Sequence, residues 1–293
     1  MKQLVILSGK GGTGKTTVAA ALAHLVSQED PIVLADADVD AANLELVLNP
    51  SKVEEHPFMG GQLACIDASL CTACGTCAEA CRFDAVIAGD ESYSIDELAC
   101  EGCASCFYQC PAEAIRMEEQ HAGQWYRSET RYGPLFHARL FAGQENSGRL
   151  VTLVKQQARL LALDTDTPFV IVDGPPGIGC PVISACAGAD LALLVVEPTI
   201  SGVHDLRRIL GTTDHFGVRS LVLINKADLN AKRAQEVESF CASRGTAVAG
   251  RVPFDVMVTE AMVHGQPVTA YSDGPVSREL RLAWEKIKGQ LEG

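Results

Sequence analysis

Short apolar runs alternate along the chain with longer segments whose apolar residues recur at helical spacing. The helical spacing is clearest in residues 17–26, 150–163 and 276–291. The apolar runs predict buried strands near residues 3–8, 31–36, 168–173, 190–196, 220–225 and 246–252. Buried strands that alternate with helices are typical of a doubly wound, mostly parallel α/β sheet, and we expect that fold class here.

The alternation stops between the second and third of these strands. Residues 49–64 break the pattern with Pro, Gly and charged residues, which predict a domain boundary. We therefore expect one domain built from residues 1–63 and 120–293, with a small domain inserted at 64–119. Downstream of the insert, an aromatic-rich segment predicts a strand at 125–130 and a turn at 132–134.

Charge is concentrated in the predicted insert. The chain has a formal net charge of −13, which argues against general nucleic-acid binding. Residues 65–119 alone contain eleven Asp or Glu and two Arg. This acidity either favours a protein partner with a basic docking face or only keeps a small domain soluble.

No apolar stretch approaches the roughly 18 residues of a membrane span, and the first strand leaves no room for a signal peptide, so we expect a cytoplasmic protein without stable membrane insertion.

A phosphate-binding loop lies between the first strand and the first helix. Residues 9–16 fit the pattern G-x-x-x-x-G-K-[ST], and the flanking strand and helix disfavour a chance glycine-rich turn. Lys15 is expected to reach the β- and γ-phosphates and Thr16 to hold Mg²⁺. The predicted phosphate contacts are Gly9, Gly11, Gly12, Thr13, Gly14, Lys15, Thr16 and Thr17.

Carboxylates follow two of the predicted strands. Asp36 and Asp38 follow the second strand, and Asp173 ends the third strand just before Gly174-Pro175-Pro176-Gly177. The carboxyl ends of parallel strands face the ligand crevice of such a sheet, so these residues are candidates to act on a phosphate and its Mg²⁺. The alternative for the first two is that they cap the next helix.

Eight of the twelve cysteines form two runs with the spacing C-x₂-C-x₂-C-x₃-C. That spacing is typical of bacterial two-cluster ferredoxins, in which the fourth Cys ligates the other cluster. It predicts two [4Fe–4S] clusters, with four zinc-binding thiolates as the weaker alternative. The predicted ligand sets are Cys71, Cys74, Cys77 and Cys110 for one cluster, and Cys100, Cys103, Cys106 and Cys81 for the other. Cys180, next to the predicted Gly177 loop, is a further candidate for a metal or redox role.

One lysine makes the phosphate-binding loop more specific. Lys10 gives the sequence K-G-G-T-G-K-T-T, which resembles the deviant P-loop of the MinD, Mrp and nitrogenase iron-protein ATPases. With the cysteine runs, nearly the whole chain resembles MinD-like ATPases that contain an inserted ferredoxin domain. The resemblance implies binding of ATP or ADP with Mg²⁺, and an ATP-dependent homodimer in which Lys10 reaches the partner's nucleotide.

The same resemblance implies roles for other residues. Asp38 would orient the attacking water, Asp36 and Asp173 would support Mg²⁺, and Gly177 would meet the γ-phosphate. Three further residues would lie beside adenine, namely Asn225, Pro253 and Asp255. Residues 225–228 also read N-K-x-D, which leaves a GTP-binding alternative.

Three functions are compatible with these features. The first is an ATP-gated iron–sulfur protein that transfers electrons to a redox partner. The second is an ATP-dependent factor for iron–sulfur or metallocofactor assembly, and the third is a MinD-like positioning ATPase with structural or sensory clusters. The amphipathic segment 276–291 predicts a helix that covers the sheet; its face is only weakly basic, which disfavours membrane contact.

Overall fold

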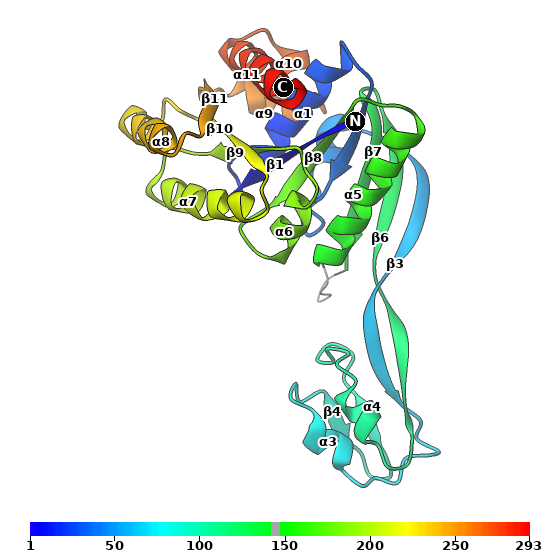
Figure 1. Ribbon diagram of the computed structural model, residues 1–293. Helices are drawn as coiled ribbons and strands as arrows, with labels where there is room; N and C mark the ends of the chain where they lie inside the picture. Colours follow the sequence, from blue (N-terminus) through cyan, green and yellow to red (C-terminus); the bar gives the residue numbers. More distant parts are fainter. Residues whose placement is uncertain (142–146) are drawn as a thin grey trace. The chain divides into compact units, whose positions relative to one another are not determined.

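A computed structural model describes residues 1–141 and 147–293, and its contacts divide the chain into two units. The larger unit holds Met1–His56, Trp125–Arg139 and Ser147–Gly293. The smaller one holds Pro57–Gln124, with Leu140 and Phe141 among its described residues. Two long strands, β3 (Ser51–Ile66) and β6 (Ile115–Thr130), carry the chain out of the larger unit and back (Figure 1).

The larger unit is built on the parallel sheet that the apolar runs predict. All six predicted strands are present, and the strand order is β11-β10-β9-β1-β8-β2-β7-β6-β3, parallel from β11 to β7. Every residue of β2 and β9 is buried, as expected for strands covered by helices on both faces. The remaining strand bounds are β1 Lys2–Ser8, β2 Ile32–Asp36, β7 Gly133–Leu140, β8 Phe169–Pro176, β9 Leu191–Val196, β10 Arg219–Asn225 and β11 Ala247–Val252.

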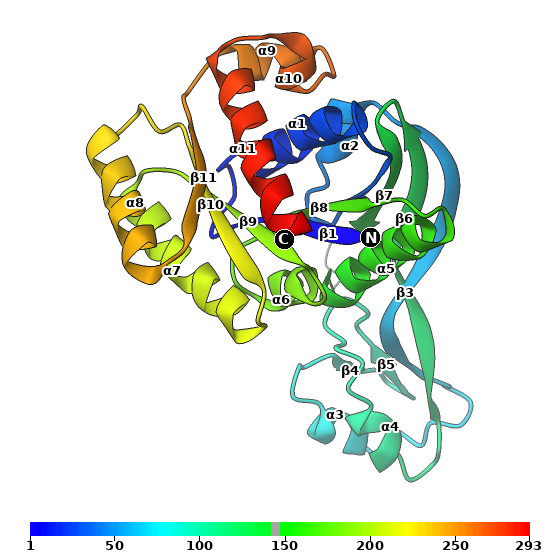
Figure 2. The ribbon, with the colours of Figure 1, turned by 45° about the horizontal axis from the view of Figure 1, so that its top comes forward.

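Helices cover both faces of this sheet (Figure 2). One face carries α1, α2, α9, α10 and α11, and the other carries α5, α6, α7 and α8. The bounds are α1 Lys15–Ser27, α2 Leu44–Leu48, α5 Ser147–Asp164, α6 Cys180–Cys186, α7 Ile200–His215, α8 Ala231–Arg244, α9 Met257–Val263, α10 Val268–Tyr271 and α11 Pro275–Glu292. In α11 the apolar face is fully buried against the core, and Trp284 meets the Phe169 ring edge-on at 5.8 Å. The interpretation of this segment as a sheet-covering helix is therefore confirmed.

Within the described residues, no helix is long and apolar enough to cross a membrane.

The boundary predicted at 49–64 contains the point where the larger unit gives way to the smaller one, between His56 and Pro57, but most of the stretch forms the strand β3. β3 is the last strand in the sheet order, and an edge strand tolerates Pro57, whose missing N–H costs no ladder bond on the open side. β6 is also longer than the predicted strand at 125–130. The expected domain limits at 63/64 and 119/120 fall inside these two strands.

The turn between β6 and β7 lies one residue earlier than predicted. It consists of Arg131 and Tyr132, and Gly133 already belongs to β7. The Thr130 hydroxyl accepts the N–H groups of Tyr132 and Gly133, both at 3.1 Å, so the side chain closes the turn.

The smaller unit repeats one short motif. Each cysteine run leads into a one-turn helix, α3 (Thr76–Ala80) or α4 (Ser105–Gln109), and the two helices contact each other. A two-stranded sheet of β4 (Val86–Ala88) and β5 (Tyr93–Ile95) lies between them in the chain. Its cluster of buried apolar residues consists of Ala64, Cys77, Cys106 and Ile115. The further buried apolar side chains described in this unit are Phe58, Ala85, Ala114 and Ala122, so mostly small side chains are buried here.

Candidate functional site

The phosphate-binding loop adopts a backbone that only glycine supports at Gly14. Its φ is +93°, and a Cβ there would lie 2.3 Å from the Asn225 amide nitrogen. Asn225 is bound to this loop, because its Nδ2 donates to the Thr13 carbonyl at 2.7 Å. Its Oδ1 accepts the Lys226 N–H at 3.0 Å. The predicted adenine contact of Asn225 stays a prediction, and the described contacts of its amide hold the loop.

A large cavity opens beside the loop and reaches α9 and α11. Its volume is about 770 Å³, ample for a nucleotide. The predicted nucleotide-site residues that line it are Gly11, Gly12, Gly14, Lys15, Thr16, Thr17, Asp38, Asn225, Pro253 and Asp255. Gly9 does not line it but packs against Asp205, where a Cβ would lie only 2.2 Å from the Asp205 Cβ. Gly177 has its N–H bound to the Ser8 carbonyl at 2.9 Å, so a γ-phosphate would have to compete for that donor.

Two carboxylates are buried next to the loop. Asp36 and Asp173 are register partners on the adjacent strands β2 and β8, and they are 0% and 1% exposed. Burial raises the pKa of Asp173 to about 6, although the Lys15 ammonium opposes the shift. Burial and the neighbouring Asp173 raise the pKa of Asp36 well above its usual range. The predicted pair thus comes together at the edge of the sheet that carries the loop.

The two carboxylates differ in their partners. Asp36 accepts the N–H of Asp38 at 3.1 Å and that of Leu44 at 3.0 Å, so it holds the segment between them. Neither oxygen of Asp173 has a hydrogen-bond partner of full geometry among the described residues, although the Thr16 side chain is close enough to lower the pKa of the carboxyl. Buried carboxylates without partners are costly, and a divalent cation would satisfy them. The residues present therefore fit a Mg²⁺ ion, which Asp173 and Thr16 would hold.

Asp38 faces the same cavity from the loop after β2. Burial raises the pKa of its carboxyl, while Lys15 acts in the opposite direction. The nearby Asp40 is exposed and lines the cavity as well. The arrangement places a carboxylate close to the lysine expected at the terminal phosphates.

Lys10 is engaged within its own chain. Its ammonium lies 3.1 Å from Glu197, which also pairs with Lys226 at 2.5 Å. Lys226 in turn donates to the Gly12 carbonyl at 3.3 Å. Glu197 is not among the residues predicted from the sequence, although its position directly after the buried strand β9 is a usable signal for a site residue.

The guanine-binding alternative for residues 225–228 has no support in the contacts. Asp228 accepts the N–H of Phe254 at 2.6 Å and does not line the cavity. The Asp228 carboxylate holds the turn after β11 by this hydrogen bond. This structural role accounts for an acidic residue at position 228, so no contact with a guanine base is needed to explain it.

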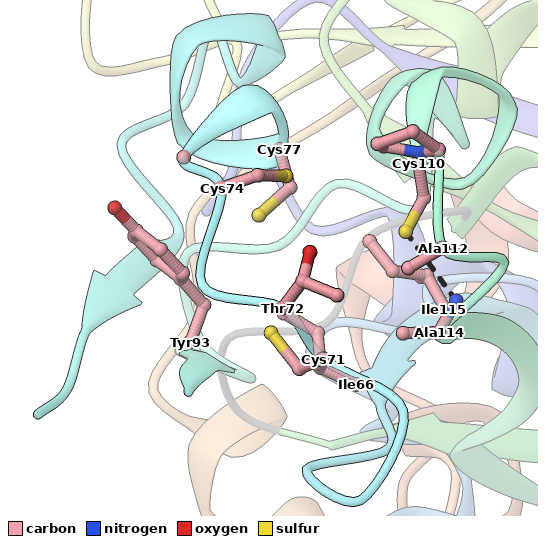
Figure 3. Close-up of a pocket in the computed structure, with 12 residues that line it drawn as sticks. Ile66, Cys71, Thr72, Cys74, Cys77, Tyr93, Cys110, Ala112, Ala114 and Ile115 are labelled. Carbon is pink, nitrogen blue, oxygen red and sulfur yellow. Dashed lines mark hydrogen bonds between the residues drawn. The ribbon is translucent and has the colours of Figure 1, made fainter. Parts of the chain in front are cut away.

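The eight cysteines of the two runs line two cavities in the smaller unit. One cavity is lined by Cys71, Cys74, Cys77 and Cys110, and the other by Cys81, Cys100, Cys103 and Cys106. In the first, Cys71 and Cys74 come from the loop before α3, Cys77 from α3 and Cys110 from the position after α4, among neighbours such as Tyr93 and Ile115 (Figure 3). Each cavity therefore takes three cysteines from one run and the last cysteine of the other. Cys65, Cys180, Cys186 and Cys241 line neither cavity.

Polar contacts around the thiols favour their charged form at the surface. The Thr76 hydroxyl, 3.5 Å from the Cys74 sulfur, lowers the pKa of that thiol, and Ser105 does the same for Cys103. The Ala114 N–H donates to the Cys110 sulfur at 3.3 Å. No group of three or more His, Cys, Asp or Glu in the described chain is arranged to hold a single metal ion. The zinc alternative thus gains nothing from the geometry, and the two [4Fe–4S] clusters stay a prediction.

Comparison with known proteins identifies the class of the larger unit. A family model described as the CobQ/CobB/MinD/ParA nucleotide binding domain matches residues 4–268. The chain therefore belongs to this family of nucleotide-binding proteins, as the deviant P-loop predicted.

Relatives and solved structures agree with that assignment. An uncharacterized protein of Methanocaldococcus jannaschii is 32% identical over 286 residues, which cover 98% of this chain and 96% of the relative. An uncharacterized ATP-binding protein of the same organism is 25% identical, with 99% and 90% coverage. The septum site-determining protein MinD of Pyrococcus horikoshii, solved with Mg-ADP, has a similar fold, with a TM-score of 0.61, 20% identity and coverage of 98% and 96%.

The burial of Asp173 predicts how stability depends on pH. A folded-state pKa near 6, raised above the ordinary value near 4, means that stability falls as pH rises through this interval. Asp173→Asn should therefore stabilise the nucleotide-free protein by about 1–3 kcal/mol at pH 8, and by less at pH 5. Urea unfolding at both pH values measures this difference. A gain that is equal at both would show that the carboxylate is not strained by burial.

Proposed function

We propose that this protein is an ATP-hydrolysing iron–sulfur protein in which the nucleotide state controls one-electron transfer through two [4Fe–4S] clusters. The observation that carries the proposal is the crossed grouping of the cysteines around two cavities. Its coarser part rests on the family, whose members share a nucleotide-binding domain.

The crossed grouping supports a ferredoxin-like domain within residues 64–119. In two-cluster ferredoxins the fourth cysteine of each run ligates the other cluster, and here Cys110 and Cys81 each line the cavity formed with the other run, which supports the proposal. When bound, such clusters supply one-electron redox chemistry. The thiolates hold them, and the Ala114 N–H at the Cys110 sulfur is the kind of contact that tunes a cluster potential.

The acidic surface of this domain favours a redox partner with a basic docking face. Eleven acidic residues against two arginines lie between residues 65 and 119. We infer that a low-potential one-electron donor reduces the protein and that an acceptor protein takes the electron. Electrostatic steering would raise the rate of that encounter and make it sensitive to salt.

The nucleotide in this proposal is ATP with Mg²⁺. A relative is named as ATP-binding and a structural neighbour was solved with Mg-ADP. In this chain Lys15 would neutralise the terminal phosphates, Thr16 and Asp173 would hold Mg²⁺, and Asp38 would orient the attacking water.

ATP would also join two copies of the chain. Lys10 would leave Glu197, its 3.1 Å partner in the single chain, and reach the nucleotide of the other subunit. Since Glu197 keeps its second partner Lys226, this exchange does not leave a buried carboxylate without a cation. Closure of the dimer is then the step by which ATP binding changes electron transfer in the cysteine domain.

A positioning ATPase is the second candidate, because the relatives include septum site-determining proteins. In that case the clusters would be structural or sensory, and ATP would control binding to a membrane or polymer. An assembly factor is the remaining alternative, and it would release iron and sulfide to an apo-acceptor. Eight cysteines in ferredoxin spacing favour stably held clusters instead.

The role of Asp38 can be tested against its neighbour Asp40, which lines the same cavity. Asp38→Ala should bind ATP normally but hydrolyse it about 10²-fold more slowly, because water is no longer oriented. Asp40→Ala should stay within about threefold of the wild type. Steady-state phosphate release and equilibrium nucleotide binding measure both effects. Equal rates in the two variants would remove Asp38 from the mechanism.

The cluster ligands can be tested by iron content. Cys74→Ser should lose one cluster, and with it about half of the bound iron, while keeping nucleotide binding. Cys65→Ser is the matched control, since Cys65 belongs to the same unit but lines neither cavity. Iron and sulfide analysis of anaerobically reconstituted protein gives the counts. Full iron content in Cys74→Ser would contradict the assignment.

The coupling itself is tested by an anaerobic redox titration followed by electron paramagnetic resonance. The cluster potential or line shape should change when ADP is replaced by a non-hydrolysable ATP analogue. Lys10→Ala should still bind ADP but fail to dimerise, as seen by light scattering, and should not show the change.

Two other results would redirect the assignment. Reducible clusters that ignore the nucleotide, combined with ATP-dependent binding to liposomes, would favour the positioning ATPase. Rapid transfer of iron and sulfide to an apo-ferredoxin would favour the assembly factor.

A further inference from the structure

A buried chain of hydrogen bonds connects three elements of the nucleotide-binding unit. His137 on β7 lies 3.1 Å from the Glu45 carboxylate on α2 through Nδ1, and 2.9 Å from the Ser128 hydroxyl on β6 through Nε2. Ser128 is 0% and His137 2% exposed. A neutral imidazole with its proton on Nδ1 satisfies both contacts, because it donates to Glu45 and accepts from Ser128.

The Ser–His–Glu arrangement has the residue types of a hydrolase, but its geometry is not catalytic. A nucleophilic serine must meet its substrate, and Ser128 is completely buried. Neither Ser128 nor His137 lines the cavity beside the phosphate-binding loop or either cysteine cavity. The contacts therefore have a positioning role within the fold.

One end of this chain of contacts leads to the nucleotide site. Glu45 lies on the short helix α2, whose first N–H, that of Leu44, is bound to Asp36. Asp36 also accepts the N–H of Asp38 and is the register partner of Asp173. A change at these carboxylates thus acts directly on the segment that carries Glu45.

The other end leads to both strands that carry the cysteine unit. α2 ends at Leu48, and only Asn49 and Pro50 separate it from β3. The return strand β6 has no such covalent proximity to α2; it contacts His137 through the Ser128 hydroxyl and through the Tyr126 ring, which stacks on the imidazole at 5.0 Å, and His137 in turn contacts Glu45. The two strands are further joined by an ion pair of 3.0 Å between Arg127 and Glu54.

We propose that the Glu45–His137–Ser128 contacts transmit the position of the switch segment, residues 36–48, to strand β6 and so to the cysteine unit. The inference rests on the proposed nucleotide site and names a route for its coupling. If Glu45 moves when a nucleotide binds, the buried imidazole must follow or lose its acceptor, and an unpaired buried polar group is disfavoured. His137 is a positioning residue in this scheme.

Amide hydrogen exchange of the reconstituted, cluster-loaded protein tests the route. It compares protein with ADP and with a non-hydrolysable ATP analogue, each with Mg²⁺. Wild-type protein should show nucleotide-dependent protection in residues 36–48, 51–66 and 115–130. Ser128→Ala should keep the response in 36–48 and lose it in 115–130.

Ser277→Ala is the matched control, because Ser277 is equally buried and its hydroxyl donates to the Val268 carbonyl outside the route. It should respond as the wild type does. Glu45→Ala, at a partly exposed position, should also lose the response in 115–130 and covers the case in which Ser128→Ala folds poorly.

Each outcome bears on a distinct claim. A wild-type response in 115–130 that survives in Ser128→Ala and Glu45→Ala would overturn the route. A response confined to 36–48 in the wild type would overturn it as well. Absence of nucleotide binding, measured in parallel with a fluorescent ATP analogue, would instead refute the nucleotide site on which the route rests.

Discussion

The burial of two carboxylates side by side is the constraint on which the larger unit depends. Asp36 and Asp173 end adjacent parallel strands and are excluded from water. Charges in such a place are tolerated only when other groups compensate them. Lys15 lowers the cost for Asp173, and two backbone N–H groups satisfy Asp36. The phosphate loop, the switch segment and α2 are therefore arranged around two buried carboxylates with only Lys15 close by as a cation, and a bound Mg²⁺ ion would add positive charge there.

The smaller unit follows a different physical logic. Its apolar cluster has four buried residues, two of them cysteines, and all eight cysteines of the two runs line two cavities. A unit of this size cannot be held together by so little apolar burial. On the proposed function, the groups bound by the eight thiolates would supply the missing stabilisation, so that metal binding and folding of this unit are linked.

The strands β3 and β6 belong to both units. Contacts made by these two strands within the larger unit can therefore affect the smaller unit through the chain itself. β3 follows α2 after two residues, and β6 is held to α2 by His137 and Ser128. Arg139 pairs with the same Glu45 carboxylate at 3.4 Å, and Arg131 donates to the Gly265 carbonyl at 3.0 Å. The polar residues after the insert therefore have structural roles within the larger unit.

The amino-acid sequence by itself determined the parallel sheet, the phosphate loop and the cysteine groups. Each is encoded locally, in an unbroken apolar run, in glycine spacing around Lys15, or in a repeated cysteine spacing. Other features depend on contacts between residues far apart in the chain. The long edge strand β3 was missed because Pro57 and its glycines read as a break, and only a free sheet edge makes them acceptable. Glu197 meets Lys10 across 187 positions, and Glu45 meets His137 across 92. No local pattern marks such pairs, because the strand order of the folded sheet decides which side chains become neighbours.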